Sequence, residues 1–344
     1  MQNLLNRQVL IRNRPTGEPK ASDFELVDSP LPVPGEGEIL CRTIYLSLDP
    51  YMRGRMNEGR SYAGGMNPAL GTVMVGGTVS EVIGSNNPAF PRGVFVLGWS
   101  GWQAYAVSSG AGLRKLDPTL SPLSTALGIL GMPGMTAYVG LLDFGRPKPG
   151  ETVVVSAASG AVGSIVGQIA KLKGSRAVGI AGSPEKCAWV VKEAGFDACV
   201  NYKAEPLGPA LQKACPNGID VYFDNVGGEV LAAVLKLINQ NARIPLCGLI
   251  SQYNAPELPP GPNLVPILVN RAHIKGFIIS DHMDRLADFL RDMSAWCREG
   301  RLKYREDVVV GLEQAPQALI GLLRGRNFGK LIVKVGEDPT LKSC

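Results

Sequence analysis

Residues 151–186 read ETVVVSAASGAVGSIVGQIAKLKGSRAVGIAGSPEK, and this stretch decides the fold. It starts with a short apolar run, Glu151 to Ala158, continues through a turn that contains Gly160 and Gly163, and becomes amphipathic up to Gly174. Strand, glycine turn and helix in this order are typical of a dinucleotide-binding unit. The glycines let the backbone approach a pyrophosphate, and the helix N-terminus offers N–H groups to it. The sequence therefore predicts a phosphate site at this turn.

The next apolar run, Ala177–Gly182, predicts a second strand, and its end indicates which cofactor binds. An NAD-specific fold usually has an Asp or Glu there, about twenty residues beyond the glycines, to bind the ribose 2′-hydroxyl. This chain has Gly182 at that place; the nearest carboxylate, Glu185, comes only after Pro184, and Lys186 follows it. A strand end without a carboxylate, with a cation a few residues beyond it, suits a 2′-phosphate, so the sequence predicts NADPH.

The glycine pattern alone is a weak signal, because Ala158 stands where the first glycine of G-x-G-x-x-G is expected, and a plain helix start could also contain these glycines. The alternation that follows is more specific. Further strands are predicted at 198–202, 219–226, 242–249 and 274–280, and helices near 184–195, 206–215, 228–240 and 263–270. Strands that alternate with helices imply a doubly wound parallel sheet covered on both faces, that is, an α/β Rossmann domain.

The rest of the chain predicts a second, β-rich domain. Short β-like runs at 37–46, 71–83, 93–97 and 103–108 are separated by Pro and Gly turns, which is typical of a partly barrel-like domain. Strands near 304–311 and 330–335, with a helix near 313–324, are expected to rejoin it, because isolated strands need partners. We therefore expect a catalytic domain of residues 1–125 plus 301–344 and an inserted NADPH-binding domain of residues 126–300, with the catalytic cleft between them.

Composition and charge exclude several classes of function. The 344 residues carry a net charge of +5 without a lysine- or arginine-rich run, which argues against a nucleic-acid-binding surface. Pro122, Pro133 and several glycines interrupt the apolar segment 120–145, so it is expected to be buried packing and not a membrane span. The N-terminus lacks the apolar core of a signal peptide. Seven scattered cysteines without C-x-x-C spacing predict reduced thiols and a cytoplasmic location.

The residue inventory favours hydride transfer without a metal. His273 and His282 are the only histidines, and neither lies in a cluster of metal-ligand type. The chain has no G-x-S-x-G elbow for a nucleophilic serine. If a hydride is added to the β-carbon of an enone, negative charge develops on the carbonyl oxygen and needs a donor, for which a neutral phenol is suited. Tyr51 and Tyr253 lie in Gly/Pro-flanked loops and are candidates, although either could be an ordinary half-buried aromatic residue.

Segments in both predicted domains resemble one family along almost the whole chain. They are LSLDPYMRGRM (46–56), LGMPGMTAYVGL (130–141), VSAASGAVGSIVGQIAKLKG (155–174), NGIDVYFDNVGG (217–228), CGLISQYNA (247–255) and RNFGKLIVKV (326–335). These segments resemble the zinc-free medium-chain dehydrogenase/reductases, and more narrowly their 2-alkenal and leukotriene/prostaglandin reductase branch. The resemblance implies a GroES-like β-rich domain, NADPH as cofactor, a small enone or enal as substrate and a homodimer joined through the last Rossmann strand.

The resemblance also implies roles for individual residues. The pyrophosphate would be held by Gly160, Ala161, Val162 and Gly163, and the 2′-phosphate side by Lys186 and Tyr202. The rest of the cofactor would be lined by Asn225, by Cys247, Gly248, Leu249, Ile250, Ser251, Gln252 and Tyr253, by the backbone of Phe277, Ile278 and Ile279, and by Asn327. Met132 and Thr136 would lie near the nicotinamide. Tyr51 and Tyr253 would face the substrate, with Tyr253 the better donor to the enone oxygen.

Departures from the family pattern concern the substrate. Tyrosines that other members place around the pocket fall at Gly77 and Val269 here, which argues against a prostaglandin and allows a bulkier enone. The Gly- and Asn-rich segment Glu58–Leu70 is a candidate substrate lid. A quinone reductase remains the alternative within enzymes, and a non-catalytic NADPH-binding protein the alternative outside them, because a fold does not determine a function.

Overall fold

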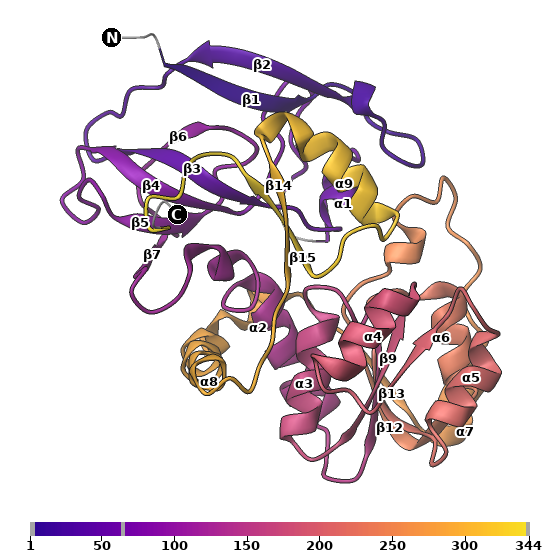
Figure 1. Cartoon of the computed structure of the whole chain (residues 1–344). Coiled ribbons are helices and arrows are strands. Elements are labelled where there is room, and N and C mark those ends of the chain that lie inside the picture. The colour runs from indigo at the N-terminus through magenta and orange to yellow at the C-terminus, as the bar shows by residue number, and fades with distance from the viewer. Residues whose placement is uncertain (1–3, 63–65, 342–344) are drawn as a thin grey trace. The chain divides into compact units, whose positions relative to one another are not determined.

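The computed structural model describes residues 4–62 and 66–341 (Figure 1). The chain divides into two compact units. One, which we call the Rossmann unit, is continuous from Ile129 to Arg305. The other, which we call the β-rich unit, consists of Met1–Gly128 and Glu306–Cys344, so both ends of the chain contribute to it.

The Rossmann unit is built on a six-stranded, wholly parallel sheet. Its strands are β8 (Thr152–Ser156), β9 (Arg176–Ala181), β10 (Ala198–Asn201), β11 (Ile219–Phe223), β12 (Ile238–Leu246) and β13 (His273–Gly276). They lie in the order β10-β9-β8-β11-β12-β13. This is the doubly wound arrangement of dinucleotide-binding folds, and it confirms the fold class predicted from the sequence. Strand order reverses between β8 and β11, so the carboxyl ends of these two strands mark the expected ligand site.

Helices cover both faces of this sheet (Figure 1), which explains why its strands are apolar on both sides. Successive side chains of a strand point to opposite faces. Val153 and Val155 of β8 therefore pack in one core and Val154 in another. The first core contains residues of α2 (Met132–Val139), α3 (Gly163–Leu172), α4 (Pro184–Lys192) and α8 (Leu286–Arg298); the second contains residues of α5 (Leu207–Ala214), α6 (Gly228–Leu235) and α7 (Val265–Asn270).

Several element ends differ from the prediction, two of them with a clear structural reason. The helix expected to reach residue 240 ends at Leu235, because β12 already starts at Ile238. Polar residues concealed the start of this strand: the Asn239 amide donates to Asp220 Oδ1 of the neighbouring strand (2.8 Å), and Asn241 has a positive φ of 62°. The strand expected over 274–280 is the short β13, and a 3₁₀-helix, η5 (Ile279–Arg285), follows it.

The apolar segment 120–145 forms three short helical pieces. These are η2 (Leu123–Leu127), α2 and the π-helical η3 (Gly140–Gly145), and the boundary between the two units falls after Gly128. Leu123 packs into the core of the β-rich unit, and Leu141 into that of the Rossmann unit. Among the described residues, no helix combines the length and the apolar character needed to cross a lipid bilayer.

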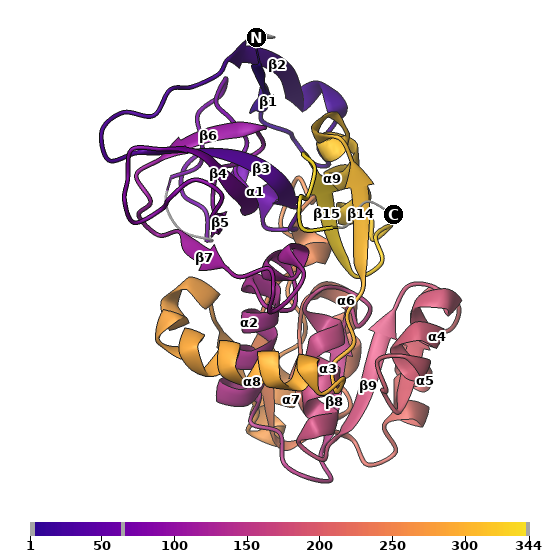
Figure 2. The ribbon, with the colours of Figure 1, turned by 60° about the vertical axis from the view of Figure 1, so that its left-hand side comes forward.

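The β-rich unit contains a mostly antiparallel seven-stranded sheet, visible in Figure 2. Its strands are β3 (Ile39–Ser47), β4 (Thr78–Ser85), β5 (Phe95–Gly98), β6 (Tyr105–Ser108), β7 (Arg114–Leu116), β14 (Glu306–Val310) and β15 (Lys330–Lys334). As expected, the C-terminal segment returns to this sheet: β15 pairs antiparallel with β3 and parallel with β14. A separate hairpin of β1 (Leu5–Ile11) and β2 (Phe24–Pro30) and the helix α9 (Ala315–Leu323) complete the unit.

Candidate functional site

The glycine turn lies directly beyond the carboxyl end of β8. The chain turns sharply at Ala157, which has a positive φ of 50°, and the Gly160 N–H donates to the Ala157 carbonyl (2.9 Å). A Cβ on Gly163 would lie 2.4 Å from that same carbonyl oxygen, so only glycine fits at the first residue of α3. Within residues 4–62 and 66–341, no acceptor contacts the backbone N–H groups of residues 161–163. The turn therefore presents N–H donors at a positive helix end, the geometry that binds a pyrophosphate.

The structure explains why Ala158 can replace the first glycine of the motif. Ala158 is fully buried, and its N–H donates to Ile180 of β9 (3.0 Å). A Cβ on Gly179 of β9 would lie only 2.8 Å from the Ala158 Cβ. Gly179 of the neighbouring strand therefore leaves the space for the methyl group of Ala158, and the close packing that the motif provides is retained.

The 2′-phosphate candidates lie at the ends of neighbouring strands. Ser183 follows β9 and caps α4, because its hydroxyl accepts from the Lys186 N–H (3.2 Å). Tyr202 follows β10, and a Cβ on Gly182 would lie 3.1 Å from its ring. A side chain at the end of β9, where NAD-specific folds carry a carboxylate, would therefore press against the Tyr202 ring and require it to shift. Lys203, which sequence reasoning missed, holds its Nζ 5.8 Å from the centre of the Tyr202 ring.

A buried carboxyl group at the end of β11 organises the switch point, the place between β8 and β11 where the strand order reverses. Asp224 Oδ1 accepts from four groups: the Tyr222 hydroxyl (2.8 Å), the Ser156 hydroxyl (3.2 Å) and the N–H groups of Val226 and Gly227 (2.9 Å each). Its other oxygen, Oδ2, is buried and has no partner among the described residues. Burial is the main reason that the pKa of Asp224 is raised, although these hydrogen bonds oppose the shift.

The Asp224 backbone and its neighbour tie three strands together. Its carbonyl accepts from the N–H groups of Cys247 (2.8 Å) and Gly248 (3.1 Å), which follow β12. The side chain of Asn225 donates to the carbonyl of Ser156 at the end of β8 (2.8 Å). The predicted residues Asn225 and Cys247 are therefore brought together at the switch point. Asp224 lies within the segment NGIDVYFDNVGG, but no local pattern there indicates that its carboxyl group is the centre of this arrangement.

The predicted loop Cys247–Tyr253 folds against the turn that follows β11. The Ser251 hydroxyl donates to the Val226 carbonyl (2.6 Å), and the Leu249 side chain occupies the space above Gly227. The Tyr253 hydroxyl oxygen accepts from the Leu249 N–H (3.3 Å). This bond uses an acceptor position of the phenol, and a tyrosine hydroxyl also has one hydrogen to donate.

Tyr51 belongs to the β-rich unit and lies at the start of α1 (Met52–Arg55). Its hydroxyl is buried and has no partner among residues 4–62 and 66–341. Burial, and next the nearby Asp49 carboxylate, raise its pKa well above the ordinary value, so the phenol stays protonated. Asp49 is itself held by Lys330 Nζ (2.7 Å) inside the same unit. A neutral, buried phenol that lacks an acceptor is a candidate donor to a ligand.

Three other predicted residues make local contacts. The Thr136 hydroxyl donates to the Met132 carbonyl within α2 (2.8 Å), so these two neighbours are connected. Asn327 belongs to the β-rich unit, where its amide donates to the Gly329 carbonyl (2.9 Å). The predicted role of Asn327 toward the cofactor stays a prediction.

Aromatic packing fixes the segment Phe277–Ile279. The Phe277 ring lies 5.1 Å from that of Phe144 and 6.2 Å from that of Phe223. A Cβ on Gly140 would lie 2.5 Å from the Phe277 ring, so the glycine at the start of η3 makes room for it. The backbone that follows β13 is thereby held at the carboxyl edge of the sheet.

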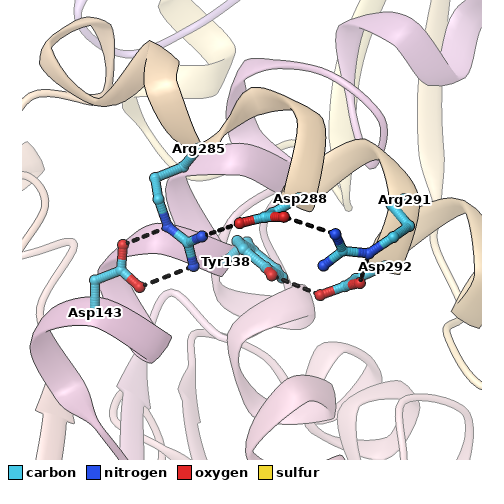
Figure 3. A network of polar contacts seen from close by, with 6 residues as sticks. All are labelled: Tyr138, Asp143, Arg285, Asp288, Arg291 and Asp292. Atoms are coloured by element: carbon cyan, nitrogen blue, oxygen red, sulfur yellow. Dashed lines mark hydrogen bonds and ion pairs between the residues drawn. The ribbon is translucent and has the colours of Figure 1, made fainter.

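A network of charged side chains holds η5 against η3 and α8 (Figure 3). Arg285 donates to both carboxylate oxygens of Asp143 (2.9 and 3.2 Å) and also to Asp288, and the Tyr138 hydroxyl donates to Asp292 (2.6 Å). Arg291 links the two α8 aspartates. Because η5 begins at Ile279, this network also fixes the end of the predicted cofactor segment.

The structure also gives the surroundings of the residues considered for metal binding and substrate selection. His282 packs edge-on against the Phe144 ring (5.3 Å), and His273 is on the exposed strand β13. Among the described residues, no three His, Cys, Asp or Glu side chains are grouped as metal ligands. A Cβ on Gly77 would lie 3.8 Å from the Trp99 ring, and Val269 is exposed. Part of the predicted lid Glu58–Leu70, residues 63–65, lies outside the described residues.

Two family models match the chain. Residues 7–116 match the N-terminal domain of oxidoreductase, and residues 161–295 match zinc-binding dehydrogenase. The chain is 52% identical over 339 residues to NADPH-dependent curcumin reductase from Escherichia coli, covering 97% of this chain and 98% of that protein. It is 44% identical over 340 residues to 2-alkenal reductase (NADP(+)-dependent) from Nicotiana tabacum, with the same coverage of 97% and 98%.

The fold matches a solved complex with the cofactor. The crystal structure of CurA in complex with NADPH from Vibrio vulnificus superimposes with a TM-score of 0.92, at 51% sequence identity, over 96% of this chain and 100% of that one. With 96% of this chain covered, the match includes most of both units.

Proposed function

We propose, from the premise that this chain belongs to the medium-chain dehydrogenase/reductase family, that it is an oxidoreductase which uses NADPH to reduce the carbon–carbon double bond of α,β-unsaturated ketones and aldehydes. The observation that carries this function is the sequence identity of 52% and 44%, over 97% of this chain, to two NADP(H)-dependent reductases, one named for curcumin and one for 2-alkenals. Both names denote substrates with a double bond conjugated to a carbonyl group.

The residues of the Rossmann unit fit NADPH. The cofactor supplies a hydride when it is bound; the protein has to hold it and leave its reactive end exposed to substrate. The open N–H groups of residues 161–163 suit the pyrophosphate, and the glycines beside them remove the side chains that would block it. The absence of a carboxylate at Gly182 suits a 2′-phosphate, which a carboxylate would repel.

We assign the 2′-phosphate to the turn that carries Lys186 and to Tyr202, and add Lys203 to the same group. Lys186 lies in the first turn of α4, where the helix dipole also favours an anion. The contact of Lys203 with the Tyr202 ring keeps a second cation near the end of β10. At the other end of the cofactor, we assign the nicotinamide to the loops after β11, β12 and β13, with Met132 and Thr136 nearby.

For the substrate, we propose that Tyr253 donates its hydroxyl hydrogen to the carbonyl oxygen. The Leu249 N–H fixes the phenol oxygen, so the orientation of the donor is set before substrate binds. Tyr51 is a second donor, kept protonated by burial. With charge on the carbonyl oxygen compensated, the β-carbon becomes more electrophilic and the α-carbon subsequently receives a proton.

We further propose a cytoplasmic homodimer joined through β13. This strand ends the sheet order, and an unprotected edge offers backbone groups to a second strand. All four of its residues are exposed, and Leu268 and Val269 of the preceding helix are 79% and 60% exposed. A second copy related by a twofold axis would cover this apolar surface. Sedimentation of the purified protein tests the assembly, and a monomer at micromolar concentration would contradict it.

An assay of NADPH oxidation against enones, 2-alkenals and quinones tests the function. We expect turnover of the first two classes, with a saturated carbonyl compound as product. Turnover of quinones alone would make the protein a quinone reductase. Binding of NADPH without turnover of any class would make it a non-catalytic binding protein.

A further inference from the structure

Two cysteines of the Rossmann unit hold their sulfur atoms next to each other. Cys187 Sγ of α4 and Cys199 Sγ of β10 lie 3.1 Å apart, and both side chains are partly exposed. A disulfide bond has an S–S distance of about 2.05 Å, so the sulfurs need to approach by only about 1 Å. Neither residue belongs to the cofactor-binding or catalytic sets assigned above.

The local packing explains why the sulfurs meet. Cys199 pairs with Gly179 of the neighbouring strand, and a Cβ at Gly179 would lie 3.2 Å from Cys199 Sγ. The glycine therefore leaves the space that the Cys199 sulfur uses. The same sheet face is covered by α4, whose Val190 is fully buried, and this contact brings Cys187 down onto β10.

The two cysteines belong to α4 and β10, the helix that contains Lys186 and the strand that Tyr202 follows. Cys187 follows Lys186, and its N–H donates to the carbonyl of the capping residue Ser183 (3.0 Å), which closes the first turn of α4. Cys199 lies three residues before Tyr202 on β10. A bond between the sulfurs would pull the first turn of α4 toward β10, and Lys186 would move with that turn.

We propose that Cys187 and Cys199 are an oxidisable pair that a hydroperoxide converts to a disulfide, and that the disulfide weakens binding of the 2′-phosphate of NADPH. The second half of this proposal rests on the cofactor assignment made above. Two-electron oxidation of a thiol pair by a peroxide is the usual chemistry of redox-sensing cysteines in reducing compartments.

The reaction balances with one peroxide per pair. The Cys187 thiolate attacks the O–O bond of hydrogen peroxide, which gives a sulfenic acid at Cys187 and hydroxide that is protonated to water. The Cys199 sulfur then attacks Cys187 Sγ; an S–S bond forms, the sulfenic oxygen leaves as a second water, and the Cys199 proton goes to it. A dithiol reverses the reaction by thiol–disulfide exchange. We assign the first attack to Cys187 because burial, and next the Cys187 sulfur, raise the pKa of Cys199 and suppress its thiolate.

Mass spectrometry tests the bond itself. The full-length protein is treated with hydrogen peroxide, its remaining thiols are alkylated, and peptides are mapped before and after dithiothreitol. We expect a dithiothreitol-sensitive loss of two hydrogens and a peptide that joins residue 187 to residue 199. Cys187→Ser and Cys199→Ser should each abolish it, whereas Cys215→Ser, a buried cysteine of the same unit, should retain it. Absence of the joined peptide in the unsubstituted protein would overturn the proposal.

Cofactor titration tests the consequence. Dissociation constants for NADPH and NADH are measured on the reduced and the oxidised protein. We expect oxidation to raise the NADPH constant about tenfold, the size of one lost charge-assisted contact, and to leave NADH within about twofold. An unchanged ratio of the two constants in the oxidised protein would overturn the switch. If the reduced protein itself shows no preference for NADPH, the cofactor assignment is wrong, whereas the mass spectra report on the disulfide independently.

Discussion

Replacement of Lys186 by alanine tests the assignment on which the cofactor preference depends. The change removes a cation from the first turn of α4 and leaves the backbone N–H that donates to the Ser183 cap. The helix start should therefore persist, since the capping bond uses the backbone and alanine favours the helix. What is lost is the side-chain contribution to binding of an anion.

The expected magnitude follows from the position of the side chain. A hydrogen bond to a charged group contributes about 1.5–3 kcal/mol, and Lys186 is partly exposed, which favours the lower end of that range. A loss of about 1.5 kcal/mol corresponds to a roughly tenfold higher dissociation constant for NADPH. NADH has no 2′-phosphate, so its dissociation constant should stay within about twofold. The difference should shrink at high ionic strength, because the contact is partly screened.

The assay is fluorescence or calorimetric titration of both cofactors, at low and high salt. Lys192→Ala is the matched control, because Lys192 is an exposed lysine at the last turn of the same helix. It should change neither dissociation constant. Equal weakening of NADPH and NADH by Lys186→Ala would refute the reasoning, since it would show that the lysine acts on a part common to both cofactors or on the fold.

Three further substitutions test other parts of the site. Tyr253→Phe should lower kcat for enones by about tenfold or more while the NADPH dissociation constant stays nearly unchanged, and unaltered turnover would remove this phenol from the mechanism. Gly163→Ala, whose Cβ would lie 2.4 Å from a backbone oxygen, should destabilise the protein by about 1–3 kcal/mol in thermal unfolding, whereas Gly208→Ala, whose Cβ meets nothing within 4 Å, should not. The folded state raises the pKa of Asp224, so the stability that its protonated form contributes is present at low pH and is lost as pH rises through the folded-state pKa. In urea unfolding, the free energy of unfolding of Asp224→Asn should therefore increase with pH relative to that of the unsubstituted protein. A difference that stays constant with pH would contradict the raised pKa.

The sequence was sufficient for the centre of the Rossmann sheet because β8, β9 and β11 are compact, mostly apolar runs. The run VVV at 153–155 has to be covered on both faces, and this requirement already implies helices on two sides. The start of β12 was hidden for the opposite reason. Asn239 and Asn241 make that strand polar, and its pairing depends on an amide contact with Asp220 of the neighbouring strand, which no local pattern contains.

The role of Asp224 could not be read from the sequence, because it is a property of four donors that converge in space. Three of them, Tyr222, Val226 and Gly227, are near in the chain, but the Ser156 hydroxyl comes from the strand 68 residues earlier. The family resemblance identifies the segment 217–228 but does not indicate that the Asp224 carboxyl group organises it. Lys203 was missed in a similar way, since only its contact with the Tyr202 ring distinguishes it from other exposed lysines.

The substitution at Ala158 shows how the motif and its neighbours act as one unit. A methyl group at this position needs the space above β9, and Gly179 supplies that space, with 2.8 Å between the Ala158 Cβ and the position of a Cβ at residue 179. The same glycine leaves room for the Cys199 sulfur. The apparent defect in the glycine motif and the approach of the two sulfurs therefore have a common structural cause. A side chain at residue 179 would disturb the phosphate turn and the thiol pair together, so both properties depend on a glycine that lies outside the recognised motif.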